Sequence, residues 1–360
     1  MRRITVKYAK PGMVLAAPTY DNYGTMLLTE HMRLDEDCLE LLQNNSVVEL
    51  LLDDWRVADL IVEPLVSPEL EGQAAQALRR LMIENQGQSS LAARNIDEVV
   101  RAANTTAREL AVDSLGEAAM AGIASEKDYL YIQPVKASVL SLLMGRKLGL
   151  ATPHLAALGV ACLLKDVGYI SLPQEMLHRP DLLTEKELLK IRQHPSYGYD
   201  LLSHHHSTSG AVANAVLQHH ERWNGSGYPH ALKEADISAF AQIIAIADTY
   251  TVLLCKRPGR KMYMPHEAIE YIMAYAGEQF NPELVELFVR QVPCYSTGLT
   301  VKLNTKETGI VSDANLGFIG RPTVRIISDE DSREVSEPYD IDLSKVEYQH
   351  KSVSEVMDYY

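Results

Sequence analysis

The chain has 360 residues, of which 46% are hydrophobic and 23% are charged, and its formal net charge is −14. This balance is that of an ordinary globular protein, and the length predicts about two or three domains. The acidic excess excludes a general nucleic-acid-binding surface, so a phosphate-bearing ligand would need a local cationic pocket.

Cysteine usage and hydropathy set further limits. The four cysteines lie far apart without CxxC spacing and are expected to be reduced thiols of a cytoplasmic protein: Cys38, Cys162, Cys255 and Cys294. The start, MRRITVKYAKPGMVL, has no long apolar run and predicts no secretory signal. No stretch reaches the roughly 18 apolar residues of a membrane span, so no span is expected.

The first 125 residues predict two segments. Residues 1–60 form a small α/β module, with strands in GMVLAAPTY, TMLLTEHMRL and VVELLLDD and a helix in DEDCLELLQNNS. Residues 61–125 form a helical connecting segment, because LEGQAAQALRRLMIENQ and NIDEVVRAANTTARELAVDSL repeat apolar residues at three- and four-residue spacing. Their broad polar faces leave room for a partner.

The rest of the chain predicts a helical domain and a β-rich extension. Residues 126–292 contain VLSLLMGRKLGL and HLAALGVACLLKDVG, which are apolar on nearly all sides, as buried helices are. Residues 293–345 read as short strands in GLTVKLN, TGIVSD and RPTVRIIS. Residues 346–360 are a tail, whose last part, KSVSEVMDYY, is expected to form a short helix or no fixed structure. The fold class is therefore mainly α.

Histidines and carboxylates of the helical domain are candidate metal ligands. Asp166, His194, the pair His219 and His220, and Asp248 offer imidazole and carboxylate groups, which suit iron, manganese or zinc. Asp248 lies in the apolar run IIAIADTYTVLL, where a carboxylate costs several kcal/mol unless it is paired or bound to a cation.

Each candidate also has a structural interpretation. His194 precedes Pro195 late in a predicted helix, and such a histidine more often meets the helix dipole than a metal. His219 and His220 are adjacent, so on a straight helix they diverge by about 100° and share one site only near a helix end. Asp248 alone could cap a neighbouring helix or hold an arginine.

Two loops complete the candidate set. In WNGSGYP, Gly225 and Gly227 permit positive φ, Pro229 fixes the exit, and Tyr228 is expected to be presented. In KRPGRK, two arginines, Arg257 and Arg260, match phosphate oxygens, although a solvated loop is an equally good explanation.

At HHERWNGSGYP the sequence resembles the HD-GYP family of bacterial cyclic di-GMP phosphodiesterases, whose pattern HHE-x-x-D-G-x-G-Y-P it departs from only at Asn224. LLKDVGYISLPQEMLHRPDLLTEKELLKIRQHPSYGYDLL and IIAIADTYTVLLCKRPGR also match family segments, and the flanks match common accompanying modules. The resemblance implies an HD-type helical bundle whose two or three metals activate water for attack on phosphorus.

Carried over by position, the family's metal ligands are Asp166, His194, His219, His220 and Asp248. Its substrate-phosphate residues are Arg257 and Arg260, whereas Gly259 replaces a tyrosine of the family. The resemblance further implies cyclic di-GMP or a related nucleotide as ligand. It makes Gly227, Tyr228 and Pro229 an interaction loop open to diguanylate-cyclase domains, and it leaves a homodimer open.

The departures from the family concentrate on the first metal position. Gln133 replaces a ligand histidine, Lys165 replaces the histidine of the HD pair, Tyr169 replaces the catalytic lysine, and Tyr129 replaces an acidic residue of three-metal members. A protonated lysine has no lone pair with which to bind a metal. The hypothesis is therefore that the Lys165 ammonium takes the first metal's place and bridges Asp166 and Asp248.

Three functions remain open on these residues. The first is a degenerate phosphodiesterase that acts as a nucleotide-binding sensor or adaptor, and it is preferred. The second is an active phosphodiesterase with one divalent metal, iron, manganese or zinc, at the positions that keep their ligands. The third is a scaffold without metal, whose histidines only form hydrogen bonds in the core.

Overall fold

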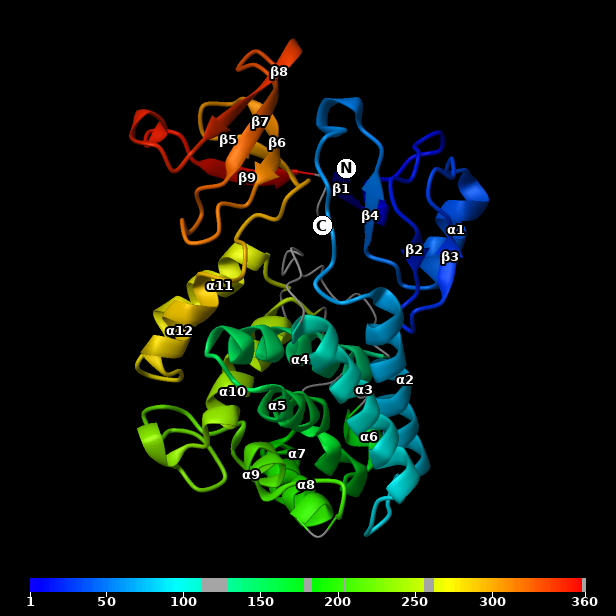
Figure 1. Cartoon of the computed structure of the whole chain (residues 1–360), viewed down its shortest axis with the longest axis vertical. Helices are drawn as coiled ribbons and strands as arrows, with labels where there is room; N and C mark the ends of the chain where they lie inside the picture. Colours follow the sequence, from blue (N-terminus) through cyan, green and yellow to red (C-terminus); the bar gives the residue numbers. More distant parts are fainter. Residues whose placement is uncertain (112–127, 178–182, 204, 256–261, 358–360) are drawn as a thin grey trace. The chain divides into compact units, whose positions relative to one another are not determined.

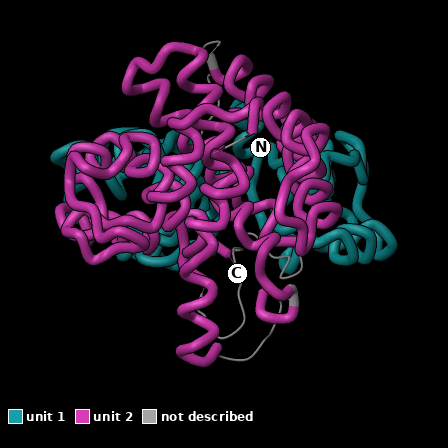
Figure 2. The backbone as a smooth tube through the Cα atoms, turned by 90° about the horizontal axis from the view of Figure 1, so that it is seen from below, with its two compact units in different colours: residues 1–64, 115–124, 289–360 teal, residues 65–114, 125–288 magenta. Residues whose placement is uncertain are grey.

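The computed structural model describes residues 1–111, 128–177, 183–203, 205–255 and 262–357. The described residues form two compact units (Figure 2): the terminal segments 1–64 and 289–357 belong to one, and the described residues of segments 65–111 and 128–288 belong to the other.

The central unit is helical. Its described elements, in chain order (Figure 1), are α2 (Pro68–Glu84), α3 (Ala93–Ala111), α4 (Tyr129–Lys147), α5 (Thr152–Leu164), η3 (Val167–Ser171), α6 (Gln174–Leu177), α7 (Glu185–Ile191), α8 (His194–Ser203), α9 (Gly210–Gln218), η4 (Glu234–Asp236), α10 (Ala239–Leu253), α11 (Pro265–Ala274) and α12 (Pro282–Val289). The bundle expected from the sequence is confirmed.

Three helices form the centre of this unit. Both α5 and α10 pack against α4, and all three are apolar on nearly every side, as VLSLLMGRKLGL and its counterparts predict. Gly145 lets α4 and α5 approach closely, because a Cβ there would lie 2.8 Å from a methyl group of Leu158. Polar side chains buried in this core need partners within it, and these partners define the site described below.

The two amphipathic helices of the predicted connecting segment pack on the same core. The helix α3 lies against α2 and α5, and α2 also contacts α4. The five-part division of the chain stays a prediction, but these two helices belong to the central unit.

One run of the central unit, Thr152–Ser171, is long and apolar enough to qualify as a membrane span by length and composition. The expectation that no stretch would reach this threshold was wrong. Two thirds of the window (67%) is buried within the fold, and the run contains the charged pair Lys165 and Asp166. It is therefore a core segment of the bundle, since buried helices pass the same test.

The terminal unit holds the strands. They are β1 (Arg2–Thr5), β2 (Thr19–Tyr20), β3 (Met26–Leu28), β4 (Glu49–Leu52), β5 (Thr300–Leu303), β6 (Thr308–Asp313), β7 (Thr323–Ser328), β8 (Glu334–Asp342) and β9 (Val353–Met357), with α1 (Glu36–Asn44) and the short helices η1 (Val6–Tyr8), η2 (Trp55–Val57) and η5 (Val346–Tyr348). The pairs β1–β4 and β2–β3 are antiparallel, and the last five strands form an antiparallel sheet in the order β8-β7-β6-β5-β9.

The tail prediction was wrong where the structure describes it. Residues 353–357 form β9, which pairs antiparallel with β5, with Val356 opposite Val301. The sequence did not reveal this strand because VSEVM has no clear alternation, and its stability comes from the edge of β5 that it covers. The predicted α1 is confirmed and begins at a side-chain cap by Asp35.

Candidate metal centre

Five segments of the central unit meet at one cluster of polar side chains. The list is Gln133 from α4, Lys165 and Asp166 from the junction of α5 and η3, His194 from α8, His219 and His220 from the end of α9, and Asp248 from α10. We call Asp166, His194, His219 and His220 the histidine half, and Gln133, Lys165 and Asp248 the lysine half.

The position of His194 differs from the sequence prediction. It is the first residue of α8 rather than a late residue of the preceding helix, because α7 ends at Ile191 and Pro195 is then accommodated in the first turn of α8. The interpretation of His194 as a histidine that meets a helix C-terminus is nevertheless confirmed, because its Nδ1 lies 2.7 Å from the carbonyl oxygen of Ile191, the last residue of α7. His219 and His220 follow the last residue of α9, Gln218. A helix end thus lets adjacent histidines reach one site, as the sequence required.

In the histidine half, four ligand-type atoms lie within 4.8 Å of one another. Asp166 Oδ1 lies 3.3 Å from His194 Nε2 and 3.8 Å from His219 Nε2. The two Nε2 atoms are 3.3 Å apart, and both imidazoles are fully buried. His220 completes the group, with its ring centroid 4.0 Å from that of His219.

Hydrogen bonds to backbone carbonyls fix the tautomers of two histidines. His194 Nδ1 lies 2.7 Å from Ile191 O, and His219 Nδ1 lies 2.7 Å from Val216 O. A carbonyl oxygen only accepts, so each Nδ1 must carry the proton and donate. In the neutral rings both Nε2 atoms then present lone pairs, which face each other and the Asp166 carboxylate.

Lone pairs that converge in a buried site offer a place for a cation between them. Three imidazoles and one carboxylate are a ligand set for a first-row divalent metal, and the carbonyl acceptors at Nδ1 orient metal-binding histidines in this way. The residues present therefore fit one metal ion, held by Asp166, His194, His219 and His220.

Protonation also favours a metal in the histidine half. Burial, with the neighbouring His194, lowers the pKa of His219 to about 4. Burial, followed by His219, holds the pKa of His220 well below its usual value. Both rings are therefore neutral near pH 7, the form that binds metals.

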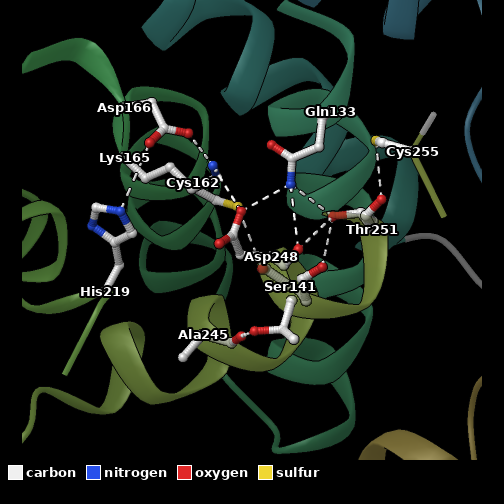
Figure 3. A network of polar contacts seen from close by, with 12 residues as sticks. Gln133, Ser141, Cys162, Lys165, Asp166, His219, Ala245, Asp248, Thr251 and Cys255 are labelled. Carbon is white, nitrogen blue, oxygen red and sulfur yellow. Dashed lines mark hydrogen bonds and ion pairs between the residues drawn. The ribbon is translucent and has the colours of Figure 1, made fainter. Parts of the chain in front are cut away.

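The lysine half contains its own cation, the ammonium group of Lys165. Lys165 Nζ forms ion pairs with Asp166 Oδ2 and with Asp248 Oδ1 (Figure 3), the latter at 2.8 Å. Only 2% of the lysine side chain is exposed. The bridge that the sequence predicted is therefore present. Since a buried ammonium needs opposite charge, both carboxylates are engaged by it.

Gln133 completes the lysine half in the position of the missing ligand histidine. Its Nε2 donates to Asp248 Oδ1 at 2.8 Å and to Thr251 Oγ1 at 2.8 Å (Figure 3). The threonine hydroxyl can accept because it donates its own hydrogen to Ala247 O. Asp248 Oδ1 thus accepts from both Lys165 and Gln133, and Asp248 is not a member of the four-residue cluster. Its role as a metal ligand stays a prediction.

The pKa directions agree with this charge pattern. Burial would raise the pKa of both Asp166 and Asp248, but the Lys165 ammonium outweighs it and lowers both, with help at Asp166 from His194. Burial would lower the pKa of Lys165, but the two carboxylates outweigh it and raise it. At neutral pH the Lys165 ammonium is therefore a cation between two anions, the carboxylates of Asp166 and Asp248.

Two glycines set the distance between the segments that carry the centre. A Cβ at Gly168 in η3 would overlap the carbonyl oxygen of His194, and one at Gly198 in α8 would lie 2.8 Å from Val216 Cγ1. These positions, in KDVG and HPSYG, need the absence of a side chain so that η3, α8 and α9 can touch. Asp166 thereby reaches the histidines.

The loop 225–229 folds back on the histidine pair. Gly225 has φ +80°, as predicted, but Gly227 does not have positive φ. Gly227 is required instead by close approach, since a Cβ would overlap the backbone of Glu221 and Arg222. Tyr228 N donates to His220 O at 3.2 Å. The loop is thus part of the wall of the centre.

Two residues that the sequence prediction missed organise this loop. The buried Glu221 carboxylate accepts from His230 N at 2.7 Å and from Leu232 N at 3.0 Å. The guanidinium of Arg192 lies over the ring of Tyr228, 5.4 Å from its centroid. Tyr228 is half-buried rather than presented. Adjacency to the motif was the available signal for Glu221, whereas nothing in the sequence pointed to Arg192.

The remaining site residues lie as follows. Tyr169, in the position of the catalytic lysine, has its ring centroid 4.4 Å from that of His194. Tyr129 is the first residue of α4. Pro229 follows Tyr228 in the loop. Arg257, Gly259 and Arg260 lie outside the described residues.

Two family models match most of this chain. The family model described as "HD domain" matches residues 97–284, and one described as "KOW domain associated with HD domain" matches residues 300–348. The cyclic di-GMP phosphodiesterase PA4108 of Pseudomonas aeruginosa is 32% identical over 199 residues, which are 55% of this chain and 48% of that protein. The cyclic di-GMP phosphodiesterase response regulator RpfG of Xanthomonas campestris is 36% identical over 149 residues, 41% of this chain and 39% of that protein.

These matches span less than half the length of either relative. Among solved structures, Bd1817, a HDG"Y"P protein from Bdellovibrio bacteriovorus, covers 79% of this chain and 97% of its own, with a TM-score of 0.48 and 15% identity.

Proposed function

The chain belongs to the HD domain family, in its HD-GYP branch, and from this premise we propose that it is a cyclic di-GMP signalling protein that binds the nucleotide at a one-metal centre without turning it over efficiently. Its relatives carry the names of cyclic di-GMP phosphodiesterases. What separates this chain from such an enzyme is the lysine half of the centre.

The observation that carries the proposal is the ion pair of Lys165 with two carboxylates. Two-metal activation of water needs two ions about 3.5–4 Å apart. The Lys165 ammonium, 2.8 Å from Asp248 Oδ1, takes the place of one of them and brings no ligand site of its own. Since Asp248 Oδ1 already accepts from Lys165 and from Gln133, a second metal would have to compete with both.

The histidine half keeps a role in ligand binding. A divalent metal held by Asp166, His194, His219 and His220 would supply Lewis-acid attraction for a phosphate oxygen. Arg257 and Arg260 would add charge-assisted hydrogen bonds to the phosphates. Tyr169 provides no permanent positive charge where the family has a catalytic lysine, so binding is retained while stabilisation of the transition state is weakened.

The location and partners belong to the same proposal. The four cysteines are free thiols, which suits a cytoplasmic protein. Gly227, Tyr228 and Pro229, which are all half-buried, would contact diguanylate-cyclase domains, and a homodimer is part of the same proposal.

The test combines metal content, nucleotide binding and turnover. We expect elemental analysis of the purified protein to give about one transition metal per chain, and calorimetry to detect cyclic di-GMP binding that the paired variant Arg257→Ala/Arg260→Ala weakens. We expect release of linear product or GMP to be negligible. Wild-type protein that bound no cyclic di-GMP would overturn the proposal.

A gain-of-function variant tests the cause. Gln133→His with Lys165→His restores the two ligands, so the metal content should rise toward two per chain and turnover should appear. If the double variant binds two metals and stays inactive, Tyr169 rather than the metal number limits catalysis, and Tyr169→Lys is then added.

A second function is favoured by the intact histidine half. Four ligand-type atoms within 4.8 Å suffice for a tight site, and one metal can activate water. A phosphodiesterase with a one-metal centre would show turnover that is lost on metal removal and restored by manganese or iron. A wild-type protein with bound metal and no turnover would rule it out.

A further inference from the structure

An aromatic stack leads from the histidine half to the protein surface. The ring of Tyr228 stacks on that of His220, with centroids 4.8 Å apart and an interplanar angle of 28°. The guanidinium carbon of Arg192 lies over the Tyr228 ring, 5.4 Å from its centroid. The Tyr228 ring therefore contacts both the imidazole of a candidate metal ligand and the guanidinium of Arg192.

The outer end of this stack is a cation open to solvent. Arg192 is exposed, whereas Tyr228 is half-buried. A guanidinium held over an aromatic ring keeps its N–H groups available at its edge, and its position is fixed with less loss of rotamer freedom than that of a free side chain. The chain thus presents an ordered arginine beside its candidate metal centre.

The backbone ties this arginine to the metal ligands. Arg192 caps the C-terminus of α7, and its N–H donates to Leu188 O at 3.0 Å. The preceding carbonyl, Ile191 O, holds the Nδ1 of His194. Residues 191 and 192 therefore do two things. The Ile191 carbonyl orients His194, a candidate metal ligand, and the helix end fixes the backbone position from which the Arg192 side chain extends.

The net charge of the chain explains why a cation at the position of Arg192 would matter for ligand binding. The chain carries a net charge of −14, so a dianionic nucleotide needs local cations. Lys165 is already paired with two carboxylates, and Tyr169 occupies the position where the family has a lysine. Arg192 is a cation of the described centre that points to solvent instead of into an ion pair in the core.

We propose that Arg192, oriented by the Tyr228 ring, binds a phosphate group of the nucleotide at the mouth of the centre. This inference rests on the proposed function and adds to it a binding residue outside the family's motifs. It also gives Tyr228 an internal role, that of positioning the arginine. The ordinary alternative is that Arg192 only complements the dipole of α7, a role that the neighbouring Lys190 would share.

The experiment measures cyclic di-GMP binding by the full chain loaded with Mn²⁺, by calorimetry at two salt concentrations. Arg192→Gln should weaken binding about tenfold or more and reduce the salt dependence of Kd, because a charge-assisted contact is lost. Arg192→Lys should recover part of the loss, since charge remains without the planar fork. Tyr228→Leu should resemble Arg192→Gln.

Lys190→Gln is the matched control. It removes the same charge from the last turn of the same helix, at an exposed position two residues away, and should leave Kd within about twofold. Equal effects of Arg192→Gln and Lys190→Gln, or no effect of either while the wild type binds, would overturn the role of Arg192 and leave the proposed function standing. A wild type that does not bind overturns both. Unchanged metal content in Arg192→Gln shows that the centre is intact.

Discussion

The two halves of the centre differ in the cation that balances their buried acceptor groups. Both bury carboxylate or imidazole acceptors that need positive charge. In the lysine half a covalently attached ammonium provides it, with Asp248 Oδ1 at 2.8 Å. In the histidine half two Nε2 atoms face each other at 3.3 Å, and under the proposed function a bound metal would supply the charge. Asp166 belongs to both, with one oxygen toward Lys165 and the other toward the histidines.

This difference teaches that loss of a metal ligand need not leave a gap. A lysine of suitable length keeps the carboxylates ionised and the core packed, so the fold survives while one metal position disappears. The lysine half should therefore contribute stability to the metal-free protein, and the histidine half should depend on a metal.

The largest expected effect is that of Lys165→Met. It leaves Asp166 and Asp248 buried without their cation and should lower the free energy of unfolding by about 3–5 kcal/mol, as measured by urea denaturation. The double variant Lys165→Met/Asp248→Asn removes the ammonium and the Asp248 carboxylate together, so it should recover a substantial part of this loss. An unfolding midpoint equal to that of the wild type would show that the bridge contributes nothing.

The halves should also respond to acid in different pH windows. His219 has a folded pKa of about 4, against about 6.5 when unfolded, so the unfolded chain binds more protons in between. The metal-free protein should therefore lose up to about 3 kcal/mol as pH falls from 6.5 to 4. The lowered pKa values of Asp166 and Asp248 preserve the lysine half until the pH falls below about 3.8.

Urea unfolding of EDTA-treated protein across this pH range checks whether the free energy of unfolding falls as the pH falls. His219→Gln cannot titrate and should flatten the slope between pH 6.5 and 4, although the neighbouring His220 retains part of it. A slope in the variant as steep as in the wild type would contradict the assignment of this window to the histidine half.

A smaller effect is expected where η3 meets α8. Gly168→Ala places a methyl group on the carbonyl of His194, and the forced shift should cost about 1–3 kcal/mol and weaken metal binding as Asp166 moves from the histidines. Gly210→Ala is the control, because no atom lies within 4 Å of a Cβ there, and it should be neutral or slightly stabilising. Equal melting temperatures for both variants would refute the packing argument.

The smallest expected effect concerns Gln133. Gln133→Met keeps the volume but removes the donor to Asp248 Oδ1 and Thr251, at a cost of about 1.5 kcal/mol, since Lys165 still pairs with the carboxylate. Metal content should not change, because Gln133 belongs to the lysine half. Denaturation and elemental analysis together check this, and a variant that gained a second metal would show that Gln133, rather than Lys165, excludes it.

Much of the centre was predictable because its geometry is local. The Nδ1 of His194 and that of His219 are each held by a carbonyl three residues earlier, so a helix end and a histidine in the right place already determine the tautomer. The apolar runs of α4, α5 and α10 likewise indicated buried helices, and the carboxylate of Asp248 within one of them indicated that it needs a partner or a bound cation in the core.

Tertiary structure decided what depends on pairing between distant segments. The sequence determined that Lys165 needs opposite charge, but only packing of α10 against α4 brings Asp248 and Gln133 to it from more than 80 and 30 residues away, respectively. The strand β9 exists because β5 offers an edge, and Arg192 became a candidate binding residue because the loop at Tyr228 folds onto it. Periodicity reports which face of an element is buried, whereas the partner on that face is chosen by the whole fold.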